Sequence, residues 1–283
     1  MKKVLVTGAN GQLGKCLQKI AHNYPHVAFD FKNSQDLDIT NFSAFAETFK
    51  RKAYDYCINC AAFTNVELAE SEQEQAFLVN AKAVKNLAKA CKENNSTLIH
   101  ISTDYVFDGT QSQPYSETAQ TNPINIYGAS KLQGEEYIQE ILEKFFIIRT
   151  SWLYSEFGHN FFKTIESKLD QETTFSITTE QTGTPTNAID LAKLILEVIS
   201  SEEQAYGLYH FSNQGETTWY GFAQAIVKLH PNAVFTVKPT DIYPTKAKRP
   251  TYSVLSKEKI IKTFNYQIDS WQESLKKLIK NNN

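Results

Sequence analysis

The chain has 283 residues, 41% of them hydrophobic, so it is long enough to bury a full core in one large or two closely joined domains. Its 29 basic and 31 acidic residues are interspersed and give a net charge of -2, which offers no basic surface for a nucleic-acid backbone. No stretch approaches the roughly 18 apolar residues of a membrane span, so we expect no membrane partner.

Short β-branched runs alternate with segments of helical period through the first half of the chain. We expect strands at 3–7, 27–31, 56–60, 97–102 and 145–149, and helices at 13–22, 42–50, 72–93 and 130–143. Repeated strand-helix units predict an α/β fold, a doubly wound parallel sheet of the Rossmann type with helices on both faces. Such sheets bind ligands at the carboxyl ends of their strands, so we expect the functional residues there.

The pattern changes beyond residue 150. We expect an aromatic stretch at 152–162, strands at 174–178 and near 207–211, helices at 188–199 and 219–229, and a polar segment at 238–251. Residues 1–150 are therefore predicted to form a dinucleotide-binding domain. Residues 151–283 are predicted to form mainly a smaller α/β substrate-binding portion, interleaved with the sheet.

The N-terminus and the cysteines indicate the compartment. Met1-Lys2-Lys3 runs directly into Val4-Leu5-Val6, which is shorter than the apolar region of a signal peptide. The one C-x-x-C pair lies inside a mostly apolar run, so Cys16, Cys57, Cys60 and Cys91 are interpreted as reduced core thiols rather than as a metal or redox site. We therefore expect a cytoplasmic protein whose functional site holds no metal.

A glycine-rich segment, Gly8-Ala9-Asn10-Gly11-Gln12-Leu13-Gly14, follows the first strand and opens the first helix. Glycines at this spacing let the chain turn sharply, let a pyrophosphate approach the backbone, and pack the helix against the sheet. An ordinary glycine-rich turn would also fit the triplet alone. The strand before it and the helix after it favour a dinucleotide phosphate site.

Asp30 lies near the end of the second predicted strand, about twenty residues beyond the glycines. A carboxylate there can accept hydrogen bonds from the ribose hydroxyls of adenosine, which favours NADH. Lys32 could instead pair with a 2′-phosphate, so NADH and NADPH both stay open. The structural alternative is a solvated aspartate at the end of a strand.

The segment Tyr127-Gly128-Ala129-Ser130-Lys131 carries the predicted catalytic chemistry. Residues four apart share one face of a helix, so Lys131 can lower the pKa of the Tyr127 hydroxyl, which can then protonate a developing alkoxide. An exposed tyrosine and lysine would give the same spacing in an arbitrary protein. Here the pair follows a dinucleotide fingerprint and the strand that ends at Ser102. The hydroxyl of Thr103, which comes directly after that strand, is well placed to hold a substrate carbonyl, although Ser102 or Thr103 could instead satisfy a turn.

Two further residues are candidates for substrate binding. Trp152 lies just past a predicted strand end, where an indole can stack on a sugar, although a buried core tryptophan fits equally well. Arg249, in a polar segment, could pair with a diphosphate because a guanidinium matches phosphate oxygens bidentately. The alternative for Arg249 is a solvated loop.

These residues resemble the extended short-chain dehydrogenase/reductase superfamily, and more narrowly the dTDP-4-dehydrorhamnose reductase family. The resemblance runs nearly end to end. It is carried by Gly8–Gly14, Asn59–Glu67, Ser102–Gly109, Tyr127–Lys131, Arg149–Tyr154, Gly183–Thr186, Gly207–Phe211 and Lys248–Pro250. The blocks of the second half are the specific ones, because the first half alone would also fit epimerases and dehydratases.

The resemblance implies that NADPH or NADH delivers hydride to C4 of a nucleotide-linked 4-keto-6-deoxyhexose, dTDP-4-dehydro-L-rhamnose, giving dTDP-L-rhamnose. It implies Tyr127 as proton donor, Lys131 as its partner, Thr103 as the residue that orients the carbonyl, and Asp104 and Trp152 as sugar contacts. The residues implied to line the cofactor site are Gly11, Gln12, Leu13, Asp30, Asp38, Ile39, Ala62, Phe63 and Thr64.

Phe63 departs from the family pattern, which often has a polar or imidazole side chain there, and this bears on cofactor preference. Some family members form homodimers through a Mg2+ ion held by acidic residues, a cluster the sequence does not locate. Two other functions stay open: a nucleotide-sugar epimerase, which returns the hydride to the same sugar, and a non-catalytic regulatory subunit. The complete set of Thr103, Tyr127 and Lys131 argues against the second.

Overall fold

The centre of the computed structural model is a six-stranded sheet in which every neighbouring pair of strands is parallel. The model describes residues 1–201, 203–241 and 243–282. The strands of the sheet are β1 (Lys2–Thr7), β2 (Val27–Lys32), β3 (Tyr56–Asn59), β4 (Thr97–Thr103), β5 (Phe145–Thr150) and β10 (Gly207–His210). Their order is β10-β5-β4-β3-β1-β2. The chain adds β2 on one side of β1 and then adds β3 and the later strands on the other side, so the order of the connections reverses between β1 and β3. Sheets of this kind bind ligands at that reversal point.

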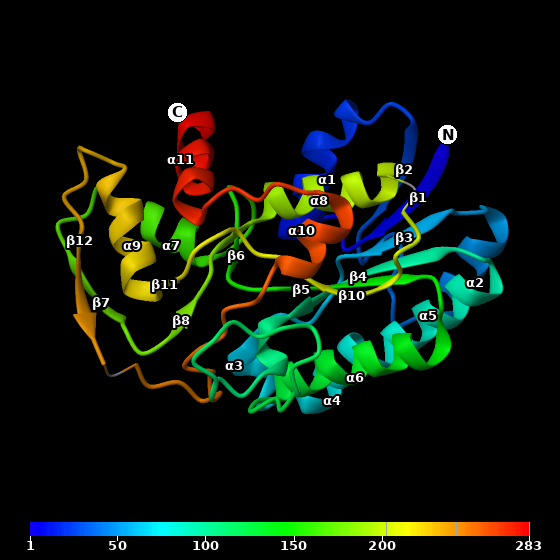
Figure 1. Ribbon diagram of the computed structural model, residues 1–283, viewed down its shortest axis with the longest axis horizontal. Helices are drawn as coiled ribbons and strands as arrows, with labels where there is room; N and C mark the ends of the chain where they lie inside the picture. The colour runs from blue at the N-terminus through cyan, green and yellow to red at the C-terminus, as the bar shows by residue number, and fades with distance from the viewer. Residues whose placement is uncertain (202, 242, 283) are drawn as a thin grey trace.

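Helices cover both faces of this sheet (Figure 1). One face carries α1 (Gln12–Ile20), α8 (Ala188–Ser201) and α10 (Glu258–Phe264). The opposite face carries α2 (Phe42–Arg51), α5 (Ala83–Glu93) and α6 (Ile126–Ile141). The predicted doubly wound parallel fold is therefore confirmed.

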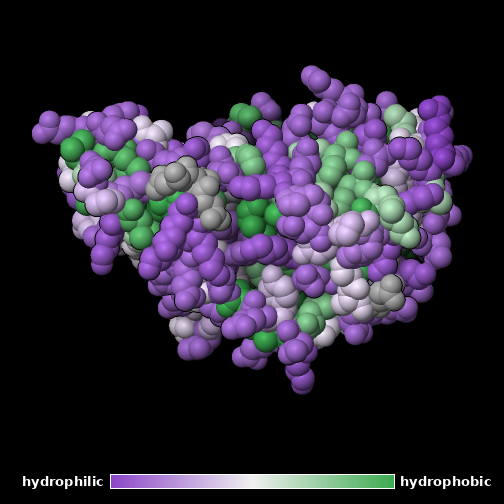
Figure 2. All heavy atoms as spheres, turned by 90° about the horizontal axis from the view of Figure 1, so that it is seen from above, coloured by the Kyte–Doolittle hydropathy of each residue, from purple (hydrophilic) through white to green (hydrophobic). Residues whose placement is uncertain are grey.

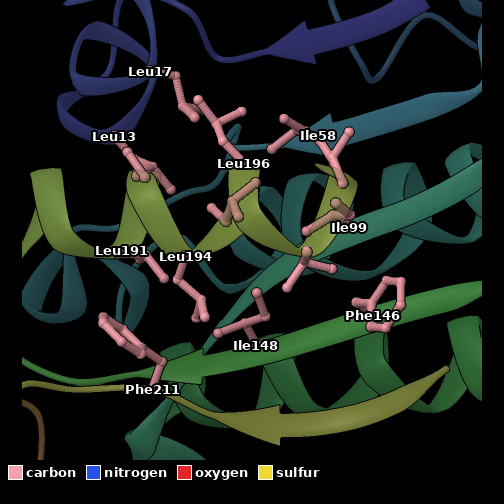
Figure 3. Packing of buried hydrophobic residues seen from close by; sticks show 14 of the residues in the cluster. Leu13, Leu17, Ile58, Ile99, Phe146, Ile148, Leu191, Leu194, Leu196 and Phe211 are labelled. Carbon is pink, nitrogen blue, oxygen red and sulfur yellow. The ribbon is translucent and has the colours of Figure 1, made fainter. Parts of the chain in front are cut away.

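The largest buried cluster lies between the sheet and the pair α1 and α8 (Figure 3). Leu191, Leu194, Ile195 and Val198 recur at helical spacing on α8 and are 2% exposed or less, so a single stripe of this helix faces the strands. Burial of each such side chain contributes about 1.5–3 kcal/mol. Since α8 belongs to the second half of the chain, both halves build this core.

A second lobe stands beside the sheet domain and has its own core (Figure 1). It consists of α7 (Phe161–Glu166), β7 (Thr174–Thr178), α9 (Trp219–Lys228), β12 (Thr236–Thr240) and α11 (Trp271–Asn282). The connections between the lobes contain four two-residue strands: β6 (Leu153–Tyr154), β8 (Thr182–Gly183), β9 (Thr186–Asn187) and β11 (Thr217–Thr218). Hydrophilic side chains predominate on the face shown in Figure 2, with smaller hydrophobic patches between them.

The structure differs from the sequence prediction in three places. The helix predicted at 130–143 begins earlier, at Ile126, because the side chain of Asn125 caps it by accepting a hydrogen bond from the Gly128 N–H at 2.8 Å. The helix predicted at 72–93 is divided into α4 (Gln73–Phe77), a π-helical turn (Leu78–Lys82) and α5. Helices α7, α10 and α11 and strand β12 were not predicted.

The strand predicted near 207–211 pairs with β5 and so completes the central sheet at its edge. The domain boundary predicted at residue 150 stays a prediction. Residues beyond it supply both α8 and β10 to the sheet domain, so the two halves of the chain are interleaved. The remaining short helical segments are α3 (Val66–Ala69) and two 3-10 turns, Ala21–Asn23 and Asp104–Val106. Among the described residues, no helix is long and apolar enough to cross a membrane.

Candidate functional site

A cleft of about 830 Å3 runs along the carboxyl ends of β1, β3, β4 and β5 and continues to α7 and α9 of the second lobe. We call the part beside the loop at residues 8–13 the glycine end. The part beside Trp152, Trp219 and Phe222 is the aromatic end. The cleft lies at the carboxyl ends of the strands, as the strand pattern predicted, and at the reversal point of the sheet.

The glycine end is shaped by close approach of backbone to backbone. Gly8 has a φ of +66°, and a Cβ atom there would lie 2.6 Å from the backbone nitrogen of Ala61. Gly11 is the N-cap of α1, where no side chain caps the helix and no acidic residue stands in the first turn. The first N–H groups of α1 therefore lack a side-chain partner at the mouth of the cleft, which suits a phosphate.

The predicted catalytic residues meet at the middle of the cleft. Thr103 ends β4, while Tyr127 and Lys131 lie one turn apart on α6, and all three line the cleft. The Tyr127 hydroxyl is in hydrogen-bond contact with Thr103. Burial raises the pKa of Tyr127 to about 12, and the contact with Thr103 opposes that shift, so the hydroxyl keeps its proton at neutral pH.

Lys131 is 2% exposed, and its Nζ donates a hydrogen bond to the Ile101 carbonyl oxygen at 2.6 Å. Burial lowers the pKa of Lys131 to about 8, although the carboxylate of Glu135, one turn further along α6, acts in the opposite direction. Glu135 is itself held by Arg149, whose Nη2 lies 2.6 Å from the Glu135 Oε2. A buried lysine that titrates near neutrality is suited to proton transfer.

Asp104 follows Thr103 and is also buried beside the cleft, at 3% exposure. Burial raises the pKa of Asp104 to about 7, against hydrogen bonds from Ser253 and Thr103 that lower it. The Thr103 hydroxyl donates to the Asp104 Oδ1 at 3.1 Å. This aspartate can therefore gain or lose a proton near neutral pH, next to Thr103 in the cleft.

Two stacked indoles form the aromatic end. The rings of Trp152 and Trp219 lie 3.7 Å apart between centroids, with 9° between their planes. Trp152 has a φ of +46°, which is rare for a bulky residue and is held here by its packing. A Cβ atom at Gly183 would lie 2.6 Å from the Trp152 ring, so only glycine leaves room for that ring. Trp219 is fixed in turn, because its Nε1 donates to the Gln181 Oε1 at 3.0 Å.

The structure brings most of the predicted residues together in this one cleft. Those that line it are Gly8, Gly11, Gln12, Leu13, Asp38, Ile39, Ala62, Thr64, Thr103, Asp104, Tyr127, Lys131 and Trp152. Gly14 lies behind the wall, where a Cβ atom would be 2.5 Å from the Gly8 carbonyl oxygen, so it serves the close packing expected of the third glycine.

Asp30 lies near the end of β2, as predicted, but is not among the residues that line the cleft, so its contact with a ribose stays a prediction. Its carboxylate accepts hydrogen bonds from the Lys52 Nζ at 2.7 Å and the Tyr54 hydroxyl at 2.5 Å, and Lys32 Nζ is 3.3 Å away. Burial acts to raise the pKa of Asp30, but these partners lower it below its ordinary value. Since β2 extends to Lys32, the cleft wall at that strand end is formed instead by Asn33 and Ser34.

Phe63 and Arg249 also lie outside the lining. Asn80 of the π-helical turn clamps the Phe63 backbone, accepting from its N–H at 2.9 Å and donating to its carbonyl oxygen at 3.0 Å. The Arg249 Nη2 donates to the Glu67 Oε1 at 2.8 Å, so this guanidinium is already paired with a carboxylate. Pairing of Arg249 with a diphosphate therefore stays a prediction.

Sequence reasoning missed several residues of the cleft. Trp219, Phe222 and His159 are contributed by the second lobe or the connection to it, and no local motif identifies them. Cys60, interpreted from the sequence as a core thiol, lines the cleft and is only partly buried, whereas the other three cysteines are fully buried. Within the part of the chain that the structure describes, no group of three or more His, Cys, Asp or Glu side chains could hold a metal ion.

The glycine end fits a dinucleotide. The steric cradle at Gly8 and the uncapped first turn of α1 provide close backbone approach and N–H donors for a diphosphate. Beyond this point the cleft continues past Thr103 and Lys131 to the aromatic end.

Comparison with known proteins agrees with this geometry. The family model described as the RmlD substrate binding domain matches residues 1–283. A dTDP-4-dehydrorhamnose reductase of Aggregatibacter actinomycetemcomitans is 37% identical over 98% of this chain and 98% of that protein. The crystal structure of a dTDP-4-dehydrorhamnose reductase from Clostridium acetobutylicum has a TM-score of 0.93 at 39% identity and covers 99% of both chains. That of a dTDP-4-dehydrorhamnose reductase from Bacillus anthracis, in complex with NADP, has a TM-score of 0.94 at 37% identity and covers 100% of both. The chain belongs to the dTDP-4-dehydrorhamnose reductase family.

Proposed function

We propose that this protein reduces the C4 keto group of dTDP-4-dehydro-L-rhamnose to give dTDP-L-rhamnose, with NADPH or NADH as the hydride donor. One observation carries the proposal: a cleft with an uncapped helix N-terminus at one end holds Thr103, Tyr127 and Lys131 at its middle. The relatives named above support the substrate, and the bound NADP of the Bacillus anthracis protein supports the cofactor.

The protein's own residues would perform the acid-base part of the reaction. A bound reduced nicotinamide supplies the hydride. Thr103 holds the C4 carbonyl oxygen, and Tyr127 gives its hydroxyl proton to that oxygen as the C4–H bond forms, so that the alkoxide leaves as an alcohol. Lys131 stabilises the tyrosinate that remains. Asp104 and Trp152 contact the sugar, since they lie next to Thr103 and at the aromatic end.

The test is to mix purified protein with enzymatically generated dTDP-4-dehydro-L-rhamnose and either NADH or NADPH. Loss of reduced-nicotinamide absorbance with stoichiometric appearance of dTDP-L-rhamnose is expected. An epimerase would interconvert sugars without net oxidation of the nicotinamide. A regulatory subunit would bind dinucleotide and leave the sugar unchanged.

A homodimer, with Mg2+ between the subunits, stays a prediction from the family resemblance. Light scattering of the purified protein with Mg2+, and again after addition of a chelator, measures the mass in both conditions. If the ion joins the subunits, we expect the mass of two chains in the presence of Mg2+ and the mass of one chain after the chelator is added.

A further inference from the structure

A chain of buried polar side chains runs beneath the cleft from β1 to α6. It joins Thr7, Asn59, His100 and Lys131, each 2% exposed or less. The Thr7 Oγ1 donates to the Asn59 Oδ1 at 2.7 Å, the Asn59 Nδ2 lies 3.0 Å from the His100 Nδ1, and the His100 Nε2 lies 3.2 Å from the Lys131 Nζ. Of these four side chains, the proposed function uses only Lys131.

The orientation of the Asn59 amide follows from a backbone group. The Ala61 N–H, which can only donate, points at the Asn59 Oδ1 at 3.2 Å. The other end of the amide, Nδ2, therefore faces His100 and donates to it. The His100 Nδ1 must accept that hydrogen bond, so it carries no proton.

The imidazole of His100 is neutral. Burial, together with the nearby charge of Lys131, lowers the pKa of His100 well below its ordinary value. A neutral imidazole carries one proton, and because Nδ1 is an acceptor, the proton is on Nε2. The Nε2–H group points at the Lys131 Nζ.

This contact distinguishes the two protonation states of Lys131. An ammonium has three N–H donors and no acceptor, so it opposes the Nε2–H of His100; an amine has a lone pair that accepts from it. In either state one N–H can donate to the Ile101 carbonyl oxygen. The other titratable groups that act on Lys131 are Cys60 and Glu135, which is paired with Arg149, while Tyr127 lies one turn earlier on α6.

We propose that Asn59 and His100 are positioning residues, in which Asn59 fixes the Nε2–H tautomer of His100 and His100 thereby stabilises the uncharged amine of Lys131. The proton affinity of Lys131 that is set in this way governs how well Lys131 supports the tyrosinate left on Tyr127 by the reduction. This last step rests on the proposed reduction. The tautomer and its effect on Lys131 do not, since they follow from the hydrogen bonds of Asn59 and from the contact between His100 and Lys131.

The first experiment reads the tautomer in the full-length chain without cofactor. Long-range 1H–15N spectra of labelled protein distinguish a protonated from an unprotonated ring nitrogen, and the His100→Gln variant identifies the His100 signals. The Nε2–H form is expected. The Nδ1–H form, or a doubly protonated ring at neutral pH, would overturn the proposal, whether or not the protein reduces the sugar.

Asn59→Asp tests whether Asn59 sets the tautomer. A carboxylate of the same shape accepts rather than donates, so His100 is expected to switch to the Nδ1–H form. Thr7→Val is the matched control, since it removes a contact to the same Asn59 oxygen but leaves the Ala61 N–H to orient the amide. Retention of Nε2–H in Asn59→Asp would exclude Asn59 as the determinant.

His100→Gln tests the effect on Lys131 without adding a charge. Its amide oxygen can accept from the ammonium, so the midpoint of the Lys131 titration, followed by 13Cε chemical shift in cofactor-free protein, should rise by about one unit or more, a tenfold or larger change in proton affinity. The basic limb of the kcat profile should move by the same amount. A purely structural role would change stability, or kcat at all pH values, and leave the midpoint in place, which would contradict the proposal.

Discussion

The glycine end and the aromatic end of the cleft are built from different kinds of segment. At the glycine end, the loop that follows β1 packs closely against the backbone that follows β3. The space between them at Gly8 is too small for a Cβ atom. At the aromatic end, Trp152 meets Trp219 and Gly183, which are far apart in the sequence and lie in short strands or at a helix start. The first depends on backbone geometry and the second on side-chain packing, so substitutions should affect them differently.

The largest expected effect comes from Gly8→Ala. Its Cβ would overlap backbone atoms of Cys60 and Ala61 at a positive φ, and we expect a loss of about 4 kcal/mol in unfolding free energy. Gly158→Ala is the matched control: Gly158 has a φ of +68°, but its Cβ would meet only the Gln12 Cβ at 3.9 Å. It should lose about 1 kcal/mol. Equal losses in urea unfolding would show that the overlap at Gly8 relaxes without cost.

Asp104→Asn should alter the pH dependence of stability. The folded-state pKa of Asp104 is raised to about 7, whereas an unfolded aspartate titrates near 4, so between these values the folded chain holds a proton that the unfolded chain has lost. The contribution of Asp104 to the unfolding free energy of the wild type therefore falls as pH rises from about 4 to about 7. Asparagine cannot ionise, so the variant should gain on wild type by on the order of 3 kcal/mol between pH 4 and pH 7. Urea unfolding measures both proteins at pH 4 and pH 8. If the unfolding free energies of wild type and Asp104→Asn differ by the same amount at both pH values, the prediction is contradicted.

Tyr127→Phe removes the proposed proton donor and leaves the ring. We expect kcat to fall about 10²-fold or more, while the dissociation constant for NADPH changes little. Tyr105→Phe is the control, because Tyr105 packs edge-on against Tyr127 but does not line the cleft. Retained turnover in Tyr127→Phe would remove this residue from the mechanism.

Trp219→Ala tests the aromatic end alone. When Trp219 is removed, the Trp152 ring loses the indole on which it stacks. We therefore expect KM for the sugar nucleotide to rise about tenfold, equivalent to about 1.4 kcal/mol, with unchanged cofactor affinity. Trp219→Phe keeps an aromatic surface and should recover most of the loss. A change in cofactor affinity instead would mean that the two ends of the cleft are coupled.

The smallest effect is expected at Asp30. Because its carboxylate is already held by Lys52 and Tyr54, Asp30→Ala should weaken NADH and NADPH binding by the same small factor, about threefold or less. Fluorescence titration with each cofactor measures this. A selective loss of NADH would restore the role first predicted for this residue.

The glycine end could be predicted because its geometry follows from a single run of sequence between a strand and a helix. The same local reasoning placed Tyr127 and Lys131 on one helix face, although it missed that Asn125 starts the helix. Its assignment of Asp30 as a ribose contact stays a prediction, because the exact end of β2 and the direction of alternate side chains decide whether a residue reaches the cleft. Trp219 and the role of His100 depend on contacts between distant segments, which no local pattern contains.

The position of β10 and α8 also bears on how the chain acquires its fold during synthesis. The apolar face of the sheet that carries Val4, Val6 and Ile99 is covered by α8, and the edge of β5 is covered by β10, which ends at His210. A nascent chain must therefore keep this face and this strand edge open to other proteins until about three quarters of its length has left the ribosome. Chaperone binding and misassembly would be concentrated in that interval, long after the cofactor-binding loop has been made.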